Sequence, residues 1–89
     1  MLRYHVAYYM PKGTDRMVVA EAVDFAGVMS QGFDLADARS MIASAMTDMA
    51  EECLQKGIAL PIPNPEASAP DADLLELVPL TIEAGAAKQ

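Results

Sequence analysis

One long amphipathic segment, residues 35–56, constrains the fold of this chain more than any other feature. Its apolar residues recur at intervals of three and four, which places them on one face of an α-helix. At about 1.5 Å per residue the helix would be roughly 33 Å long, whereas an average globular helix has only about 11–12 residues. Such a helix needs a sheet or another chain against its apolar stripe. The stripe comprises Leu35, Ala38, Ile42, Ala45 or Met46, Met49 and Cys53.

The residues at both ends of this segment are typical of helix boundaries. Asp34 can accept hydrogen bonds from the free N–H groups of the first turn, and Asp37 adds negative charge at the positive end of the helix dipole. Lys56 lies in the last turn, Gly57 can adopt the left-handed conformation that closes a helix, and Pro61 prevents continuation. We therefore predict that the helix begins and ends at these positions.

The residues before the helix favour three short antiparallel strands. Residues 3–10 alternate between two faces, residues 11–15 supply the proline, glycine and aspartate of a turn, and residues 16–24 are rich in valine and alanine. Residues 28–31 are long enough for a third strand. Together these segments predict a β-meander over residues 3–31. The small side chains on one face of the second strand would let a helix pack closely.

The residues after the helix predict an extended connection and one more strand. Residues 57–73 contain four prolines, which favours an extended segment without secondary structure of its own. Residues 74–82 return to a strand-like composition. Since Pro79 cannot donate to a hydrogen-bond ladder, this last strand should lie at an edge of the sheet.

The expected fold is therefore α+β: an antiparallel three-stranded meander, one long helix on one face, and a C-terminal strand, in the order β-β-β-α-β. With 89 residues, the chain is expected to form a single domain over residues 1–89. One helix covers only one face of such a sheet, so the other face must be polar or be covered by another chain. Because that face carries apolar residues, we expect an interface there and a homo-oligomer, either a dimer or a tetramer.

The charge of the chain argues against direct binding of nucleic acid. The formal net charge is −7, and beyond Ser40 there are eight carboxylates but only two cations, Lys56 and Lys88. Nucleic-acid affinity comes largely from Lys and Arg side chains that neutralise phosphates, so such a surface repels DNA and RNA. A basic protein partner is a better complement to this charge.

The sequence also argues against membrane, secreted and disulfide-stabilised classes. No apolar run approaches the roughly 18 residues of a membrane span. The first residues lack the apolar core and the cleavage site of a signal peptide, so we expect a cytoplasmic protein. The single Cys53 falls on the apolar stripe of the helix, which indicates a buried thiol and no internal disulfide.

Two motifs resemble the HicB-type antitoxins of bacterial toxin–antitoxin pairs. In that family a strand ending in A-E-x-P-D-x-P-G is followed by apolar residues, Ser or Thr, Gly, and a capped helix that begins with Leu and acidic residues before Ala. The corresponding residues here are 20–38, with Val23 and Ala26 at the positions of the family's prolines. The second motif is the exit Gly-x-x-x-Pro-x-Pro after the helix, at residues 57–63. The resemblance covers residues 3–65.

The resemblance implies a partial RNase H-like fold that binds and masks a small basic toxin of the HicA type, an RNA-cleaving protein with a double-stranded-RNA-binding-like fold. Members of the family often continue into a helix-turn-helix or ribbon-helix-helix segment that binds operator DNA. The sequence ends at Gln89 without such a segment. We therefore expect no DNA-binding domain, and contacts through protein alone.

An RNase H-like fold raises the question of catalysis by carboxylates around Mg²⁺. Glu21 and Asp24 are three residues apart and would point to opposite faces of a continuous strand, so Asp24 is expected to organise the following turn instead. His5 is the only histidine and is expected to be a solvated or hydrogen-bonded surface residue. We predict no catalytic residues, no metal site and no cofactor.

Three functions remain open at this point. The first is an antitoxin-like interaction module that neutralises a small basic HicA-like toxin. The second is a degenerate RNase H-like hydrolase or a small-ligand-binding protein, and the third is an orphan domain that pairs only with itself. We favour the first. The residues expected to contact the partner combine charge with aromatic anchors near the hairpin and the turn; they are Tyr8, Tyr9, Glu21, Asp24 and Phe25.

Overall fold

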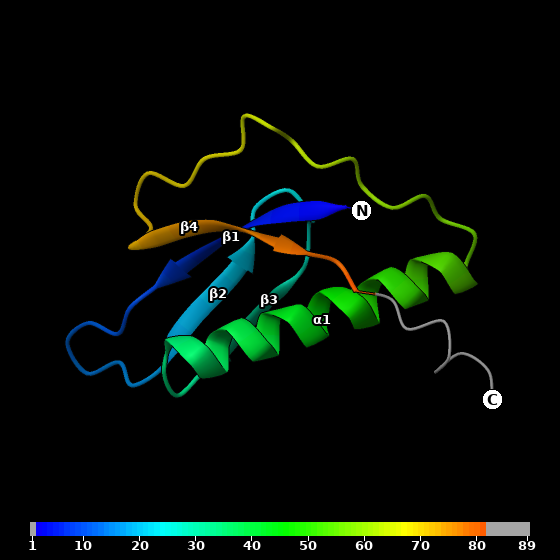
Figure 1. Cartoon of the computed structure of the whole chain (residues 1–89). Coiled ribbons are helices and arrows are strands. Elements are labelled where there is room, and N and C mark those ends of the chain that lie inside the picture. The colour runs from blue at the N-terminus through cyan, green and yellow to red at the C-terminus, as the bar shows by residue number, and fades with distance from the viewer. Residues whose placement is uncertain (1, 82–89) are drawn as a thin grey trace.

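The computed structural model describes residues 2–81, which form one four-stranded antiparallel sheet packed against one helix (Figure 1). The strands lie in the order β3-β2-β1-β4, and each neighbouring pair is antiparallel. The expected α+β fold with element order β-β-β-α-β is confirmed. The elements are β1 (Arg3–Tyr9), β2 (Val18–Ala22), β3 (Met29–Gly32), α1 (Leu35–Gln55) and β4 (Leu74–Pro79).

The strand boundaries differ from the predicted ones by one or a few residues. The strand predicted over residues 16–24 ends at Ala22 because the chain turns there, and the Ala22 N–H donates to the Val28 carbonyl at 3.0 Å. The last strand, predicted over residues 74–82, ends at Pro79. Residue 82 itself lies outside the described residues.

The core lies between the sheet and α1. Alternate residues of β1 and β2 point toward the helix, and the helix residues that meet them recur every four positions. Alanines on the helix-facing side of β2 leave room for the helix, as the sequence predicts. The buried side chains of this layer include Tyr4, Val6, Tyr8, Val18, Ala20, Ala22, Ala38, Ile42, Met46 and Ala50.

The buried stripe of α1 ends earlier than the sequence predicts. Ala50 is the last fully buried residue of the helix, whereas Cys53 is only half-buried and Leu54 is 54% exposed. The reason is that the C-terminal end of α1 extends past the sheet (Figure 1). The prediction of a buried Cys53 thiol is therefore wrong.

Both ends of α1 have the cap geometry that the sequence predicts. The Asp34 carboxylate accepts from the Asp37 N–H at 2.8 Å, which caps the first turn, and the Asp37 carboxylate accepts from the Phe33 N–H, just before the N-cap, at 2.9 Å. At the C-terminal end Gly57 has a φ of 72°, and the Ile58 N–H donates to the Cys53 carbonyl at 2.8 Å. This pattern closes the last turn and releases the chain.

Gly32 brings β3 against the first turn of α1. The residue is buried, and a Cβ placed on it would overlap the backbone of Asp37 and Ala38, with the Ala38 Cα at 2.8 Å. Only a glycine permits this approach. The contact fixes the distance between the helix and one edge of the sheet.

Residues 57–73, which we call the Pro-rich segment, return from the end of α1 to the start of β4 without helix or strand, as predicted. The sheet lies between this segment and the helix (Figure 1). The Tyr4 hydroxyl donates to the Pro61 carbonyl at 2.7 Å near one end of the segment. Near the other end the Asp73 N–H donates to the Tyr8 carbonyl at 2.9 Å, and the Asp73 carboxylate accepts from the Met10 N–H at 2.7 Å.

The strand β4 occupies an edge of the sheet, as Pro79 predicts. The Leu80 N–H donates to the Leu2 carbonyl at 2.9 Å. Because inward and outward backbone groups alternate along an antiparallel strand, the Pro79 nitrogen lies on the outer edge, where no N–H is needed.

Candidate protein-interaction surfaces

Asp24 lies in the loop between β2 and β3 and connects three separate parts of the chain. Its Oδ1 accepts from the His5 backbone N–H at 2.8 Å, and its Oδ2 lies 2.9 Å from both the His5 Nδ1 and the Asn64 backbone N. The Asp24 side chain is only 4% exposed. Asp24 therefore joins β1 and the Pro-rich segment to its loop, instead of only organising its own turn. The expectation of a hydrogen-bonded His5 is confirmed.

These hydrogen bonds determine the charge state of the aspartate. Burial raises the pKa of Asp24, whereas the hydrogen bonds from the His5 ring and from the backbone N–H groups of Asn64 and His5 lower it, and the net shift is downward. The donors thus stabilise the ionised carboxylate. Its oxygens are engaged within the chain, so Asp24 has a structural role in the folded state.

Tyr8 and Phe25, two of the residues expected to contact a partner, lie in the core. Phe25 is 2% exposed, and its ring lies 4.9 Å from the Tyr4 ring, measured between centroids. Tyr8 is fully buried beside Arg39, whose guanidinium carbon is 5.9 Å from the centroid of the tyrosine ring. The folded chain therefore uses both aromatic rings for packing and does not present them on its surface.

The Tyr8 hydroxyl is buried without a hydrogen-bond partner among the described residues. Both oxygens of the nearby Glu76 accept from Arg39, at 3.0 and 3.1 Å. Burial raises the pKa of Tyr8, and the negative charge of Glu76 raises it further, so the hydroxyl remains neutral. The Arg39–Glu76 pair joins α1 to β4 above this ring.

Tyr9 and Glu21 lie on the face of the sheet that points away from α1, which we call the outer face. In the ladder between β1 and β2, Tyr9 pairs with Val19 and Glu21 pairs with Ala7. Both side chains are half-buried. Of the five residues expected at the partner contact, these two alone share a surface, while Asp24, Tyr8 and Phe25 are engaged inside the molecule.

The outer face also carries apolar side chains from β4. Leu75 is 39% exposed and Leu77 is 54% exposed. The prediction that this face is fully open is wrong, because the Pro-rich segment covers part of it. Between the segment and the sheet lies a hollow of about 510 Å³, lined by Leu2, Arg3, His5, Pro63, Pro65 and Leu77.

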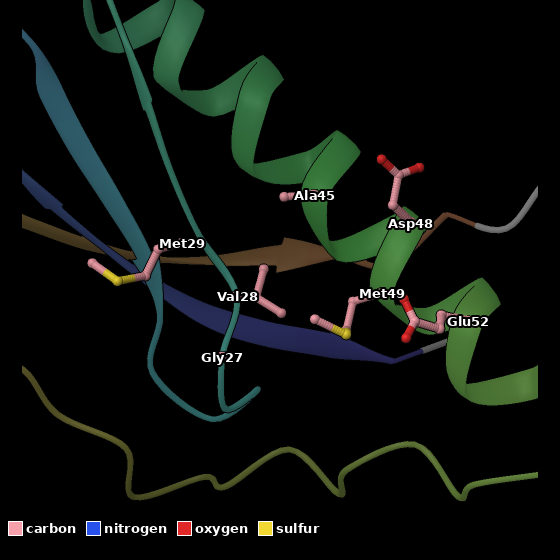
Figure 2. Close-up of a pocket in the computed structure, with 7 residues that line it drawn as sticks. All are labelled: Gly27, Val28, Met29, Ala45, Asp48, Met49 and Glu52. Atoms are coloured by element: carbon pink, nitrogen blue, oxygen red, sulfur yellow. The ribbon is translucent and has the colours of Figure 1, made fainter. Parts of the chain in front are cut away.

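A separate groove runs between the start of β3 and the C-terminal half of α1 (Figure 2). It has a volume of about 260 Å³, below the roughly 300–1,000 Å³ typical of small-molecule pockets. Apolar side chains come from the loop and the helix, and two carboxylates come from the helix, whereas the Met29 side chain points away from the helix and Met29 borders the groove with its backbone (Figure 2). The lining residues are Gly27, Val28, Met29, Ala45, Asp48, Met49 and Glu52.

The sequence alone does not predict this groove. The sequence does predict that the four groove residues of α1 share one side of the helix, because they are three and four positions apart. They are Ala45, Asp48, Met49 and Glu52. Nothing in the sequence indicates that Met29, at the edge of the sheet, lies beside them. That proximity arises only when β3 packs against α1.

No three side chains of His, Cys, Asp or Glu within residues 2–81 lie close enough together to hold a metal ion. Among the described residues, no helix is both long enough and apolar enough to cross a membrane.

The sheet order and the single long helix define a small α+β fold, and comparison with solved structures shows where this fold is already known. The chain has the fold of the N-terminal domain of the Burkholderia pseudomallei antitoxin HicB, with a TM-score of 0.68, 18% identity, and coverage of 91% of this chain and 100% of that one. A chain of the HicA3 and HicB3 toxin–antitoxin complex matches with a TM-score of 0.61 and 18% identity, over 88% of this chain and 96% of that one. Protein-family models give no match, and a search of the curated proteins gives none either.

Proposed function

We propose that this chain is an antitoxin-like interaction module that binds and neutralises a small basic toxin of the HicA type, an RNA-cleaving protein. The observation that carries the proposal is the fold shared with the HicB N-terminal domain over 91% of this chain and the whole of that one. A similar chain within a toxin–antitoxin complex supports the same class of partner. In this proposal the chain acts by binding and not by catalysis.

The charge of the chain supports a basic partner. The net charge is −7, and most carboxylates of the second half of the chain lie on exposed or half-exposed positions. Opposite charge on a partner would speed the encounter and suppress wrong pairings. The same charge supports the absence of direct contact with nucleic acid, because phosphates would be repelled.

We also propose that the chain forms a homo-oligomer, a dimer or a tetramer, in the cytoplasm. The exposed Leu75 and Leu77 support self-association, because neighbouring exposed apolar side chains on a small protein are typical of interfaces. The oligomeric state can be measured by sedimentation equilibrium on the purified chain.

The proposal is tested by expressing this chain together with the protein encoded beside its gene. We expect the neighbouring gene to encode a small basic protein that arrests growth when expressed alone and degrades RNA in vitro. Co-expression with this chain should restore growth, and the two proteins should elute together in size-exclusion chromatography. As a control, Ile42→Asp, which places a charge in the core, should fold poorly and fail to restore growth.

Two results would contradict the proposal. One is a neighbouring protein that is basic and toxic but is neither bound nor neutralised by this chain. The other is ribonuclease activity of this chain by itself that depends on a divalent metal ion and is lost in Asp24→Ala. The second result would favour the degenerate hydrolase instead.

A further inference from the structure

The outer edge of β3 has backbone groups that no described strand satisfies. β3 is an edge strand and pairs only with β2 in the described sheet. The Ala22 N–H donates to the Val28 carbonyl. Since bonded and non-bonded pairs alternate along an antiparallel ladder, Ser30 also bonds toward β2, whereas the N–H and C=O groups of Met29 and Gln31 point outward. These outward groups form a template for another strand.

The two edges of the sheet differ in how they are protected. At the β4 edge, Pro79 removes one outward donor, which is a common way to prevent strand addition. β3 has the sequence Met-Ser-Gln-Gly, which contains no proline and no charged residue. The β3 edge therefore remains able to accept an added strand.

The groove described above lies directly beside this edge (Figure 2). Val28 is buried beside the groove and Met49 packs partly against the core, whereas the Met29 side chain is 60% exposed and points to the outer face, where its ladder partner Glu21 also lies. Its small volume suits one apolar side chain better than a separate ligand. A strand added to β3 would place every second side chain on the helix side of the sheet, where the groove lies.

The charges at the groove indicate what kind of chain fits it. Glu52 is paired with Lys56 at 2.7 Å, whereas Asp48 is exposed and has no cation within 4.0 Å among residues 2–81. A Lys or Arg on the added strand would complement Asp48. A second copy of this chain would instead bring its own acidic surface, with a net charge of −7, toward these carboxylates.

We propose that an extended segment of a basic partner adds to β3 as a fifth strand, with one apolar side chain in the groove and a Lys or Arg beside Asp48. This inference rests on the proposed function, since the partner is the small basic toxin. Backbone hydrogen bonds to Met29 and Gln31 supply the register, and the groove and Asp48 supply the specificity.

The test compares three variants of the full chain for binding to the small basic protein encoded beside the gene, by isothermal titration calorimetry. Gln31→Pro removes an outward N–H and leaves the bonds to β2 in place. Asp48→Lys reverses the charge at the groove. Each should weaken binding about tenfold or more. Asp15→Lys, an equal charge change in the exposed β1–β2 turn, is the matched control and should stay within about twofold of wild type.

The outcomes separate this inference from the proposed function. If the wild type binds the basic protein and Gln31→Pro and Asp48→Lys bind it as tightly as Asp15→Lys does, the docking site is overturned. The antitoxin role then still stands. Failure of the wild type to bind the basic protein overturns both. A wild-type dimer that Gln31→Pro converts to a monomer assigns the edge to a second copy and also overturns the inference. If thermal unfolding shows that Gln31→Pro is not folded, the comparison of Asp48→Lys with Asp15→Lys decides the outcome by itself.

Discussion

The two faces of the sheet are held by different kinds of contact. Against α1, β1 and β2 bury a continuous apolar layer that includes Tyr4, Ile42 and Met46. Against the Pro-rich segment, the sheet is joined through a few hydrogen bonds, of which those of Asp24 are the best shielded from water. A buried aliphatic side chain contributes about 1.5–3 kcal/mol, whereas a hydrogen bond contributes about 0.5–1.5 kcal/mol net. The helix face therefore determines stability, and the outer face can be altered at a smaller cost.

The largest difference between the two faces should come from the centre of the helix. Ile42→Ala leaves a cavity under a fully buried side chain, so the free energy of unfolding should fall by about 2–5 kcal/mol. Urea denaturation followed by circular dichroism measures the change. Met41→Ala, at a neighbouring position that is 46% exposed, should change it by less than about 0.5 kcal/mol. Equal losses in the two variants would contradict the assignment of the core.

A second substitution tests the contact between the helix and the edge of the sheet. In Gly32→Ala the new methyl group would overlap the backbone of Asp37 and Ala38, so the strand and the helix must separate. We expect a loss of about 1–3 kcal/mol in unfolding free energy. Gln31→Ala in the same strand is exposed and should lose no more than about 0.5 kcal/mol. If Gly32→Ala is as stable as wild type, β3 and the first turn of α1 are less closely packed than described.

On the outer face, Asp24→Ala should release the Pro-rich segment without unfolding the sheet. The substitution leaves the backbone N–H groups of His5 and Asn64 without their acceptor, which should cost about 1–3 kcal/mol. Hydrogen exchange should become faster at the Asn64 amide, while the amides of α1 keep their protection. Asp71→Ala, at an exposed position in the same segment, is the control. Loss of protection throughout the chain would mean that the two faces are equally important for stability.

The smallest expected effect is a pH dependence that arises from the same aspartate. The pKa of Asp24 is lower in the folded chain than its ordinary value of 3.8, so its stabilising contribution is complete above pH 3.8 and is lost as the pH falls through the folded-state pKa. Between about pH 5 and pH 2, wild type should lose stability with a slope that Asp24→Ala lacks, and this difference should not exceed about 1.4 kcal/mol per pH unit. Parallel curves for the two proteins would assign the acid sensitivity to other carboxylates.

The helix and the strands could be predicted because their signals are local. The caps at Asp34 and Gly57 and the spacing of Ala38, Ile42 and Met46 determine where the helix begins, ends and faces. Alternation within β1 also placed Tyr8 on the same side as Tyr4 and Val6, which is the side that the helix covers. The aromatic character of Tyr8 favours a partner contact, but its place in this alternation assigns it to the core.

The site residues were harder to predict because their partners are distant in sequence. Asp24 bonds to residues 19 positions before it and 40 positions after it, and no local pattern encodes either contact. Phe25 follows the end of β2, where alternation no longer indicates which face a side chain takes. The groove beside Met29 likewise depends on the packing of an edge strand against α1.

The position of β1 in the sheet has a consequence for synthesis of the protein. β1 precedes the other described strands in the sequence, yet it lies in the middle of the sheet, between β2 and β4, and β4 is the last of the described strands to be made. On the ribosome the hairpin with β2 can form early, but the other side of β1 stays bare until Leu74–Pro79 has emerged. A bare strand edge of this kind can join the strands of other nascent chains. Chains released before this point therefore expose the edge of β1 and are prone to aggregation, and this risk ends only when β4 has paired with β1.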